Sequence, residues 1–175
     1  MATAFDKVRF LVVEDNEASV QIVRTLLNAI GAKDIVAERS VAGALRRIES
    51  EKLDIVILDL RLGTDDGLDV LRAVRRQDSR HAFLPVLVLS AYTDQTRVEA
   101  ARDVGATEVC AKPVSPAELY RRLMAMIVEP RPYVRSDGYF GPDRRRHPED
   151  EYQGVERRAE STRDREKLGA TAAVG

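Results

Sequence analysis

Short apolar runs rich in β-branched residues alternate along the chain with longer segments in which apolar residues recur every three or four positions. The runs are nearly continuous, which is typical of strands that a parallel sheet buries on both faces. The pattern predicts strands at residues 8–13, 34–39, 53–58, 85–89 and 107–111.

The segments that follow the strands have the period of amphipathic helices. In the first of them Val20 and Val23 belong to one apolar face, and Asp15 or Asn16 is suited to be the N-cap. The helix expected at 94–104 has the thinnest apolar stripe, so it should be the least firmly anchored. The other helices are expected after Ser40, over 68–74 and over 115–128.

This alternation predicts an α/β fold, a doubly wound five-stranded parallel sheet with five helices on its two faces and right-handed crossovers. The domain should occupy residues 1–129. From residue 130 to 175 the chain is rich in Pro, Gly and Arg, poor in aliphatic residues and nearly balanced in charge. Because such a segment buries too little apolar area to offset its ordering entropy, we expect a mostly irregular, flexible extension.

Composition narrows the functional classes. The net charge of −1 shows no overall nucleic-acid footprint, so direct DNA binding is not expected. The single cysteine, Cys110, excludes an intramolecular disulfide framework and a cysteine-based metal site. No apolar run is long enough for a membrane span, and the first residues lack the pattern of a signal peptide. These features predict a cytoplasmic protein without a membrane partner.

Polar side chains stand where four of the predicted strands end. Glu14 and Asp15 follow the first strand, Asp59 follows the third, Ser90 the fourth and Lys112 the fifth. Because open α/β sheets place their ligand sites at the carboxyl ends of the strands, we expect all five side chains along one edge.

The chemistry of this set points to phosphoryl transfer. Three neighbouring carboxylates repel one another unless a cation neutralises them, and a hard ion such as Mg²⁺ prefers oxygen ligands. A lysine suits a phosphoryl oxygen, and an aspartate can itself accept a phosphoryl group. Each residue alone has an ordinary explanation, such as a helix cap, a turn hydroxyl or a solvated lysine. The hypothesis therefore depends on the whole set.

Residues 1–128 resemble the receiver domain of two-component response regulators. The matching motifs occur in order: VVEDN at 12–16, VILDLRL at 56–62, DG at 66–67, VLSA at 88–91 and AKP at 111–113. The resemblance implies a flavodoxin-like fold with strand order 2-1-3-4-5 and a cis peptide bond between Lys112 and Pro113.

The resemblance also implies roles for the strand-end residues. Asp59 would be the phosphoacceptor, and Ser90 and Lys112 would contact phosphoryl oxygens. A histidine kinase or phosphotransfer protein would be the donor and another protein the target, with self-catalysed phosphotransfer and autodephosphorylation as the only chemistry. The implied Mg²⁺ ligands are Glu14, Asp15, Asp59 and the backbone carbonyl of Arg61.

The sequence departs from the family pattern at the switch residue, the aromatic side chain that in many receivers responds to phosphorylation. Val109 stands three residues before the lysine, where many receivers carry a tyrosine or phenylalanine. Tyr92 is a substitute switch candidate together with Ser90, and a partly exposed loop tyrosine is the other interpretation. Arg61 and Tyr92 lie two residues after the phosphoacceptor and Ser90. Both are bulky, so we expect them to shield the aspartyl phosphate from water and to prolong its lifetime.

Three other classes of function share part of this pattern. A receiver-fold module that acts independently of phosphorylation is one, although the intact set of site residues argues against it. A hydrolase of the haloacid-dehalogenase type would need a second aspartate where Arg61 stands. A flavodoxin-like cofactor binder would place a flavin phosphate against acidic strand ends.

The extension also leaves alternatives open. It is either a disordered linker, a peptide that docks on a partner, or a segment that folds back on the domain. Aromatic residues and an arginine cluster between Tyr133 and Arg146 favour a contact with the face formed by the helix at 94–104, the fifth strand and the last helix.

Overall fold

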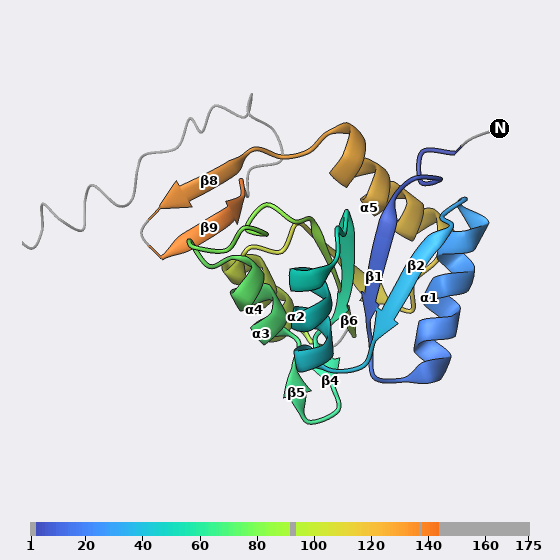
Figure 1. The fold of residues 1–175 in the computed structure, drawn as a ribbon, viewed down its shortest axis with the longest axis horizontal. Coiled ribbons are helices and arrows are strands. Elements are labelled where there is room, and N and C mark those ends of the chain that lie inside the picture. The colour runs from blue at the N-terminus through green and yellow to red at the C-terminus, as the bar shows by residue number, and fades with distance from the viewer. Residues whose placement is uncertain (1–2, 92–93, 137, 144–175) are drawn as a thin grey trace, which may run out of the picture. The chain divides into compact units, whose positions relative to one another are not determined.

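The computed structural model describes residues 3–91, 94–136 and 138–143. A five-stranded parallel sheet forms the centre of this part of the chain, in the order β2-β1-β3-β6-β7 (Figure 1). In terms of these five strands the order is 2-1-3-4-5, so the predicted fold class and topology are confirmed. The strands are β1 (Arg9–Val13), β2 (Asp34–Glu38), β3 (Ile55–Asp59), β6 (Val86–Ala91) and β7 (Glu108–Lys112).

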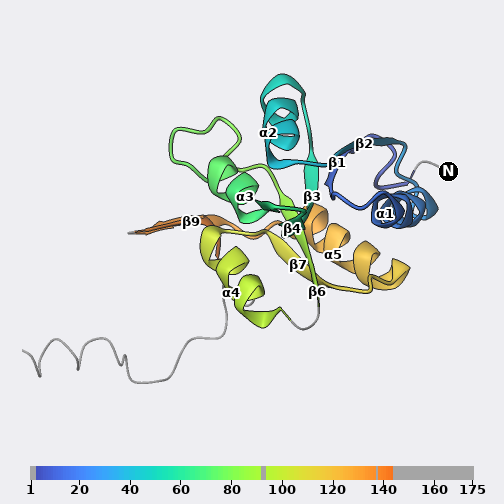
Figure 2. The same ribbon diagram turned by 90° about the horizontal axis from the view of Figure 1, so that it is seen from below.

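Helices cover both faces of the sheet (Figure 2). One face packs against α1 and α5 in a cluster that includes Val23, Leu27 and Leu119. The other packs against α2, α3 and α4 in a second cluster of buried aliphatic side chains. The helices are α1 (Glu17–Ala29), α2 (Val41–Ser50), α3 (Leu68–Val74), α4 (Gln95–Val104) and α5 (Pro116–Val128).

Side-chain caps determine where three helices begin. Asn16 accepts from the backbone N–H of Ser19 at 3.0 Å, so Asn16 is the N-cap of α1 and Asp15 is not. Ser40 caps α2 and Ser115 caps α5 in the same manner. Because Asn16 satisfies the helix end, the Asp15 side chain is not required for capping.

The helix α4 is held by little apolar area. Ala101 is its only fully buried side chain, whereas Val98 and Val104 are partly buried. Gly105, in the left-handed conformation with φ +108°, ends the helix. The thin apolar stripe expected from the sequence is therefore confirmed, and α4 contacts α3, β6 and β9.

Two small hairpins lie at opposite ends of the sheet (Figure 1). The strands β4 (Arg61–Leu62) and β5 (Asp65–Asp66) form the first, directly after β3. The strands β8 (Tyr133–Ser136) and β9 (Tyr139–Pro142) form the second, beyond α5. The compact unit accordingly runs to Arg144.

The β8–β9 hairpin differs from the mostly irregular extension predicted for residues 130–175, whereas the predicted contact of this segment with the helix at 94–104 is present between β9 and α4. The aromatic side chains of the hairpin bury area against residues distant in sequence, which an average composition does not reveal. Residues 144–175, including Tyr152, lie outside the described part of the chain. No helix in the described part is long and apolar enough to cross a membrane.

Candidate functional site

Three of the five strand-end residues are in direct contact. The Lys112 ammonium, at the end of β7, donates to Asp59 Oδ2 at 2.5 Å and to Glu14 Oε2 at 2.6 Å. Asp59 is the last residue of β3, and Glu14 directly follows β1. The parallel topology therefore brings together residues that are far apart in the sequence. We call this group of Lys112, Asp59 and Glu14 the Lys112 cluster.

Burial and charge oppose each other in the Lys112 cluster. Glu14 is only 3% exposed, and this burial raises the pKa of its carboxyl group, although the hydrogen bond from Lys112 works in the opposite direction. Burial alone would lower the pKa of Lys112, but the hydrogen bonds to Asp59 and Glu14 outweigh it and raise that pKa. The two acidic partners therefore favour the charged form of Lys112.

Both carboxylate oxygens of Asp59 are engaged. Lys112 binds Oδ2, and the backbone N–H of Arg61 donates to Oδ1 at 3.0 Å. The chain returns tightly behind this residue at Gly67, where a Cβ would lie 2.1 Å from the Asp59 carbonyl oxygen. Only glycine fits this close approach. The loop after β3 therefore holds the Asp59 carboxylate in one orientation at the sheet edge.

Asp15 and Ser90 lie at the same edge without joining the Lys112 cluster. The Asp15 Oδ2 atom is 3.6 Å from the position of a Cβ on Gly63, in the turn of the β4–β5 hairpin. Ser90 is buried on β6, next to Leu89, which pairs with Asp59 across the sheet. Its hydroxyl has the Ala91 carbonyl oxygen as an acceptor at 3.5 Å. Within the described residues, neither side chain hydrogen-bonds to Asp59.

The side chain of Arg61 binds Asp94, the N-cap of α4. Its guanidinium donates to Asp94 Oδ2 at 3.0 Å and is 72% exposed. Tyr92, the other residue predicted to act as a switch and to tune the lifetime, lies outside the described residues. Val109 is partly buried and packs against the core on the α4 side of the sheet.

One residue of this region was missed by sequence reasoning. Arg97, on α4, donates to the Leu60 carbonyl oxygen at 2.7 Å and to Asp66 Oδ1 at 2.5 Å. Leu60 directly follows Asp59, so Arg97 binds the backbone of the phosphoacceptor loop. Nothing in the sequence distinguishes Arg97 from the other arginines of a polar helix, because its acceptors lie more than thirty residues away.

The acidic side chains at this edge of the sheet are the candidate ligands of a magnesium ion. Among the described residues, no group of three or more His, Cys, Asp or Glu side chains is gathered closely enough to hold a metal. In this conformation the Lys112 ammonium supplies the positive charge between Glu14 and Asp59. The oxygen chemistry of Glu14, Asp15 and Asp59 at one sheet edge nevertheless fits a hard divalent cation, which keeps several waters and needs few carboxylates.

Two further expectations can be compared with the structure. The peptide bond between Lys112 and Pro113 is cis, as the resemblance implied. Cys110 is buried inside β7, and burial raises the pKa of its thiol. A neutral, buried thiol acts as a small apolar side chain, as expected.

Comparison with known proteins agrees with this geometry. The family model of the response regulator receiver domain matches residues 10–124. The KDP operon transcriptional regulatory protein KdpE of Escherichia coli is 36% identical over 113 residues, which cover 65% of this chain and 48% of KdpE. The chain thus spans about half the length of this curated relative.

Solved structures of response regulators and receiver domains are also similar to this chain. The chemotaxis response regulator CheY4 of Vibrio cholerae superposes with a TM-score of 0.61 at 26% identity, over 69% of this chain and 98% of CheY4. The receiver domain of the sensor histidine kinase PA1611 from Pseudomonas aeruginosa gives a TM-score of 0.60 at 28% identity, over 67% and 94% of the two chains. That structure has a magnesium ion coordinated in its active site cleft.

Proposed function

The chain belongs to the response regulator receiver family of two-component systems, and from this membership we propose that it accepts a phosphoryl group on Asp59 and thereby changes its binding to other proteins. Receiver domains are phosphoacceptors that interact with histidine kinases or phosphotransfer proteins. We infer that one of these is the donor for this chain. The chain's own chemistry is then limited to transfer onto Asp59 and loss of the group by autodephosphorylation.

The contact between Lys112 and Asp59 carries this proposal. Oδ2 of Asp59 lies 2.5 Å from a lysine whose pKa is raised by hydrogen bonds to two carboxylates. A cation at this distance stabilises negative charge that develops on a phosphoryl group attached to Asp59. Ser90, at the neighbouring strand end, is the proposed second phosphoryl contact.

We propose Mg²⁺ as the cofactor, held by Glu14, Asp15, Asp59 and the backbone carbonyl of Arg61. The bound ion would supply the charge neutralisation that phosphoryl transfer requires. Glu14 is almost fully buried, and a cation beside it would offset the cost of burying its carboxylate. We place the reaction in the cytoplasm, in line with the single, buried, unpaired cysteine.

Phosphorylation of the purified chain tests the proposal directly. The chain is incubated with Mg²⁺ and acetyl phosphate, and the intact mass is measured over time. We expect one added phosphoryl group, which Asp59→Asn abolishes, whereas Glu14→Gln and Asp15→Asn weaken Mg²⁺ binding. An unchanged mass together with no binding of beryllofluoride, a stable mimic of the phosphoryl group, would refute the proposal.

A phosphorylation-independent interaction module is the second candidate. The position of Val109 favours it, because an aliphatic residue packed against the core replaces the aromatic residue that usually responds to the modification. Capture of partners from a cell extract separates the two functions. Partners that bind the unmodified chain and Asp59→Asn equally, with and without beryllofluoride, would favour this second candidate.

A further inference from the structure

The helix α4 connects the phosphoacceptor loop to the β8–β9 hairpin. Its ten residues span about 15 Å at the rise of an α-helix. Its first turns lie beside the β4–β5 hairpin, where Arg97 and Asp94 bind the loop after Asp59. Its C-terminal end lies beside β9. Its single fully buried side chain is Ala101, and along its length the helix also packs against α3 and β6.

The contact between α4 and β9 is a backbone-to-backbone approach of two glycines. A Cβ on Gly105, the C-cap of α4, would lie 2.6 Å from the Phe140 carbonyl oxygen. A Cβ on Gly141 would lie 2.7 Å from the Cα of Gly105. Neither glycine has room for a side chain, so the two backbones are closely packed here, and a displacement of the helix end should displace β9 as well.

A buried arginine fastens the hairpin to the same place. Arg75, only 5% exposed, donates to the Gly105 carbonyl oxygen at 2.8 Å and to the carbonyl oxygens of Ala82 and Leu84 at 2.8 and 2.9 Å. It also donates to the Tyr133 hydroxyl at 3.3 Å. One guanidinium therefore joins the end of α4, the loop before β6 and the hairpin.

Aromatic side chains complete the docking. The ring of Phe83 lies 5.2 Å from that of Tyr133 and 5.3 Å from that of Phe140, measured between centroids. Phe83 is still 64% exposed, so the hairpin covers only part of it. The apolar area that holds the hairpin is modest, and its docking can be shifted by contacts of ordinary strength.

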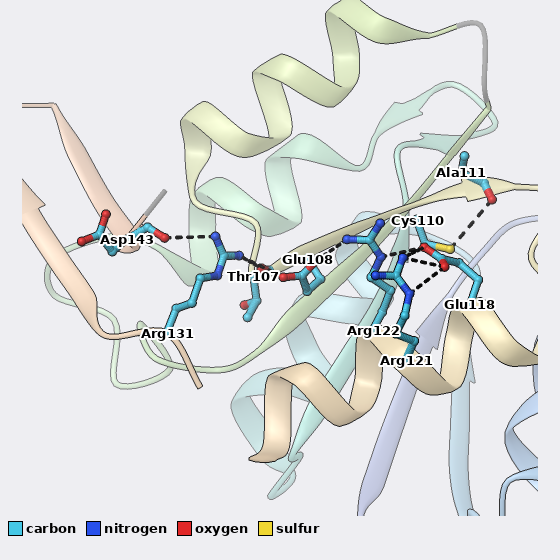
Figure 3. A network of polar contacts seen from close by, with 9 residues as sticks. All are labelled: Thr107, Glu108, Cys110, Ala111, Glu118, Arg121, Arg122, Arg131 and Asp143. Carbon is cyan, nitrogen blue, oxygen red and sulfur yellow. Dashed lines mark hydrogen bonds and ion pairs between the residues drawn. The ribbon is translucent and has the colours of Figure 1, made fainter. Parts of the chain in front are cut away.

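Charged side chains anchor the root of the hairpin (Figure 3). Arg131 donates to the carbonyl oxygens of Thr107 and Asp143 and to Glu108 Oε1 at 3.3 Å. Glu108, at the start of β7, also accepts from Arg122 of α5 at 2.8 Å. These contacts hold the chain that leads into β8 at the opposite end of β7 from Lys112.

We propose that the docking of the β8–β9 hairpin and the modification of Asp59 are coupled through α4. The proposal rests on the proposed function of Asp59. The docked hairpin holds Gly105, and through α4 it maintains the contacts of Arg97 and Asp94 with the loop of the unmodified Asp59. A phosphoryl group on Asp59 rearranges that loop and loosens the hairpin, and loosening the hairpin makes the modified state easier to reach. The hairpin is thus the part of the extension that senses the state of Asp59.

Thermodynamic linkage makes this coupling testable in both directions. In the first direction, hydrogen exchange of the full-length chain is measured with and without Mg²⁺ and beryllofluoride. We expect the ligand to increase exchange in peptides covering 131–143. In the second direction, calorimetry measures the affinity for beryllofluoride in Gly141→Ala, which places a methyl group against Gly105. We expect this variant to bind about fivefold more tightly or better.

Control variants test whether the effect of Gly141→Ala on the affinity comes from the contact between β9 and α4. Val134→Ala changes an exposed residue of β8, which pairs with Gly141 across the hairpin, and should leave the affinity unchanged. Tyr133→Phe removes only the hydroxyl that contacts Arg75, and it should act in the same direction as Gly141→Ala with a smaller effect. When Arg97→Gln has already released the other end of α4, Gly141→Ala should lose its effect on the affinity.

The outcomes separate the two proposals. If the unmodified chain binds beryllofluoride, but Gly141→Ala and Tyr133→Phe bind it equally or more weakly and the hairpin exchange is unaffected, the coupling is wrong and the proposed function stands. If the unmodified chain does not bind beryllofluoride and takes up no phosphoryl group, the proposed function fails and the coupling fails with it.

Discussion

Each end of the sheet has a group of polar residues built around one cationic side chain. The two cations differ in the kind of group that they bind. In the Lys112 cluster the ammonium binds two carboxylates and remains partly exposed. In the second group, which we call the Arg75 cluster, the guanidinium binds the carbonyl oxygens of Gly105, Ala82 and Leu84 and is nearly inaccessible. Burial lowers the pKa of Arg75, whereas the carboxylates raise that of Lys112.

This difference indicates which cluster can do chemistry. Carboxylate side chains can exchange a lysine for a metal ion or a phosphoryl oxygen without unfolding the backbone. Carbonyl oxygens at the end of α4 and in the loop before β6 cannot exchange a guanidinium without disrupting those segments. A search for buried, perturbed cations alone would rank Arg75 above Lys112, so the identity of the partners is the better guide to function.

Removing the cation of the Lys112 cluster should have the largest effect. Lys112→Met keeps an apolar stem of similar length but leaves Glu14 and Asp59 without their common partner. We expect the rate of phosphorylation by acetyl phosphate to fall by about 100-fold, the scale of losing one preorganised charge-stabilising donor. Intact mass over time gives the rate. Lys52→Met, at an exposed lysine, is the control, and equal rates for both variants would contradict the proposed role.

A substitution in the Arg75 cluster should instead lower the stability of the fold. Arg75→Lys retains the charge but cannot donate to the three carbonyl oxygens in the fixed geometry of a guanidinium. We expect the free energy of unfolding to fall by about 2–4 kcal/mol, because buried acceptors lose their donor. Urea denaturation measures it. Arg76→Lys, at the exposed neighbour that binds Asp78, should leave the midpoint unchanged. A tolerated Arg75→Lys would show that the cluster is not structural.

Replacing Arg61 should change the lifetime of the phosphorylated state and leave the stability of the fold nearly unchanged. Its side chain is largely exposed and binds Asp94, so Arg61→Ser should cost little stability, as for other surface ion pairs. If the side chain shields the aspartyl phosphate from water, the lifetime of the phosphorylated state should shorten several-fold. Decay of the mass adduct after removal of acetyl phosphate measures the lifetime, with Arg72→Ser as the surface control. A lifetime that is unchanged or longer would exclude shielding.

The smallest effect is expected midway along β7, between the two clusters. Cys110→Ala removes a buried sulfur and should cost about 1 kcal/mol of stability, with no change in phosphorylation or in hairpin exchange. Because burial raises the pKa of the thiol, the folded chain keeps this proton at a pH where the unfolded chain loses it. The stability of the unmodified chain should therefore fall with rising alkaline pH relative to Cys110→Ala. Parallel pH profiles in urea denaturation would contradict this.

Local pattern was sufficient for the sheet and for the position of the site. Continuous apolar runs and helical periodicity are set by neighbouring residues, and parallel topology then brings the strand ends to one edge. Asp59, Glu14 and Lys112 could be found in this way because each stands where a strand stops. Element ends were less accurate: β3 was expected at 53–58 and runs from Ile55 to Asp59, because hydrogen bonding across the sheet determines the ends.

Contacts between distant residues were decided by the tertiary structure alone. Arg97 differs from Arg102, the other arginine of α4, in reaching Leu60 and Asp66. The β8–β9 hairpin is ordered because Tyr133 and Phe140 meet Phe83 and Arg75, fifty or more residues earlier in the chain. The composition of a segment does not reveal such pairs. The free energy of docking depends on which few side chains are in contact, and not on how many apolar residues the segment contains.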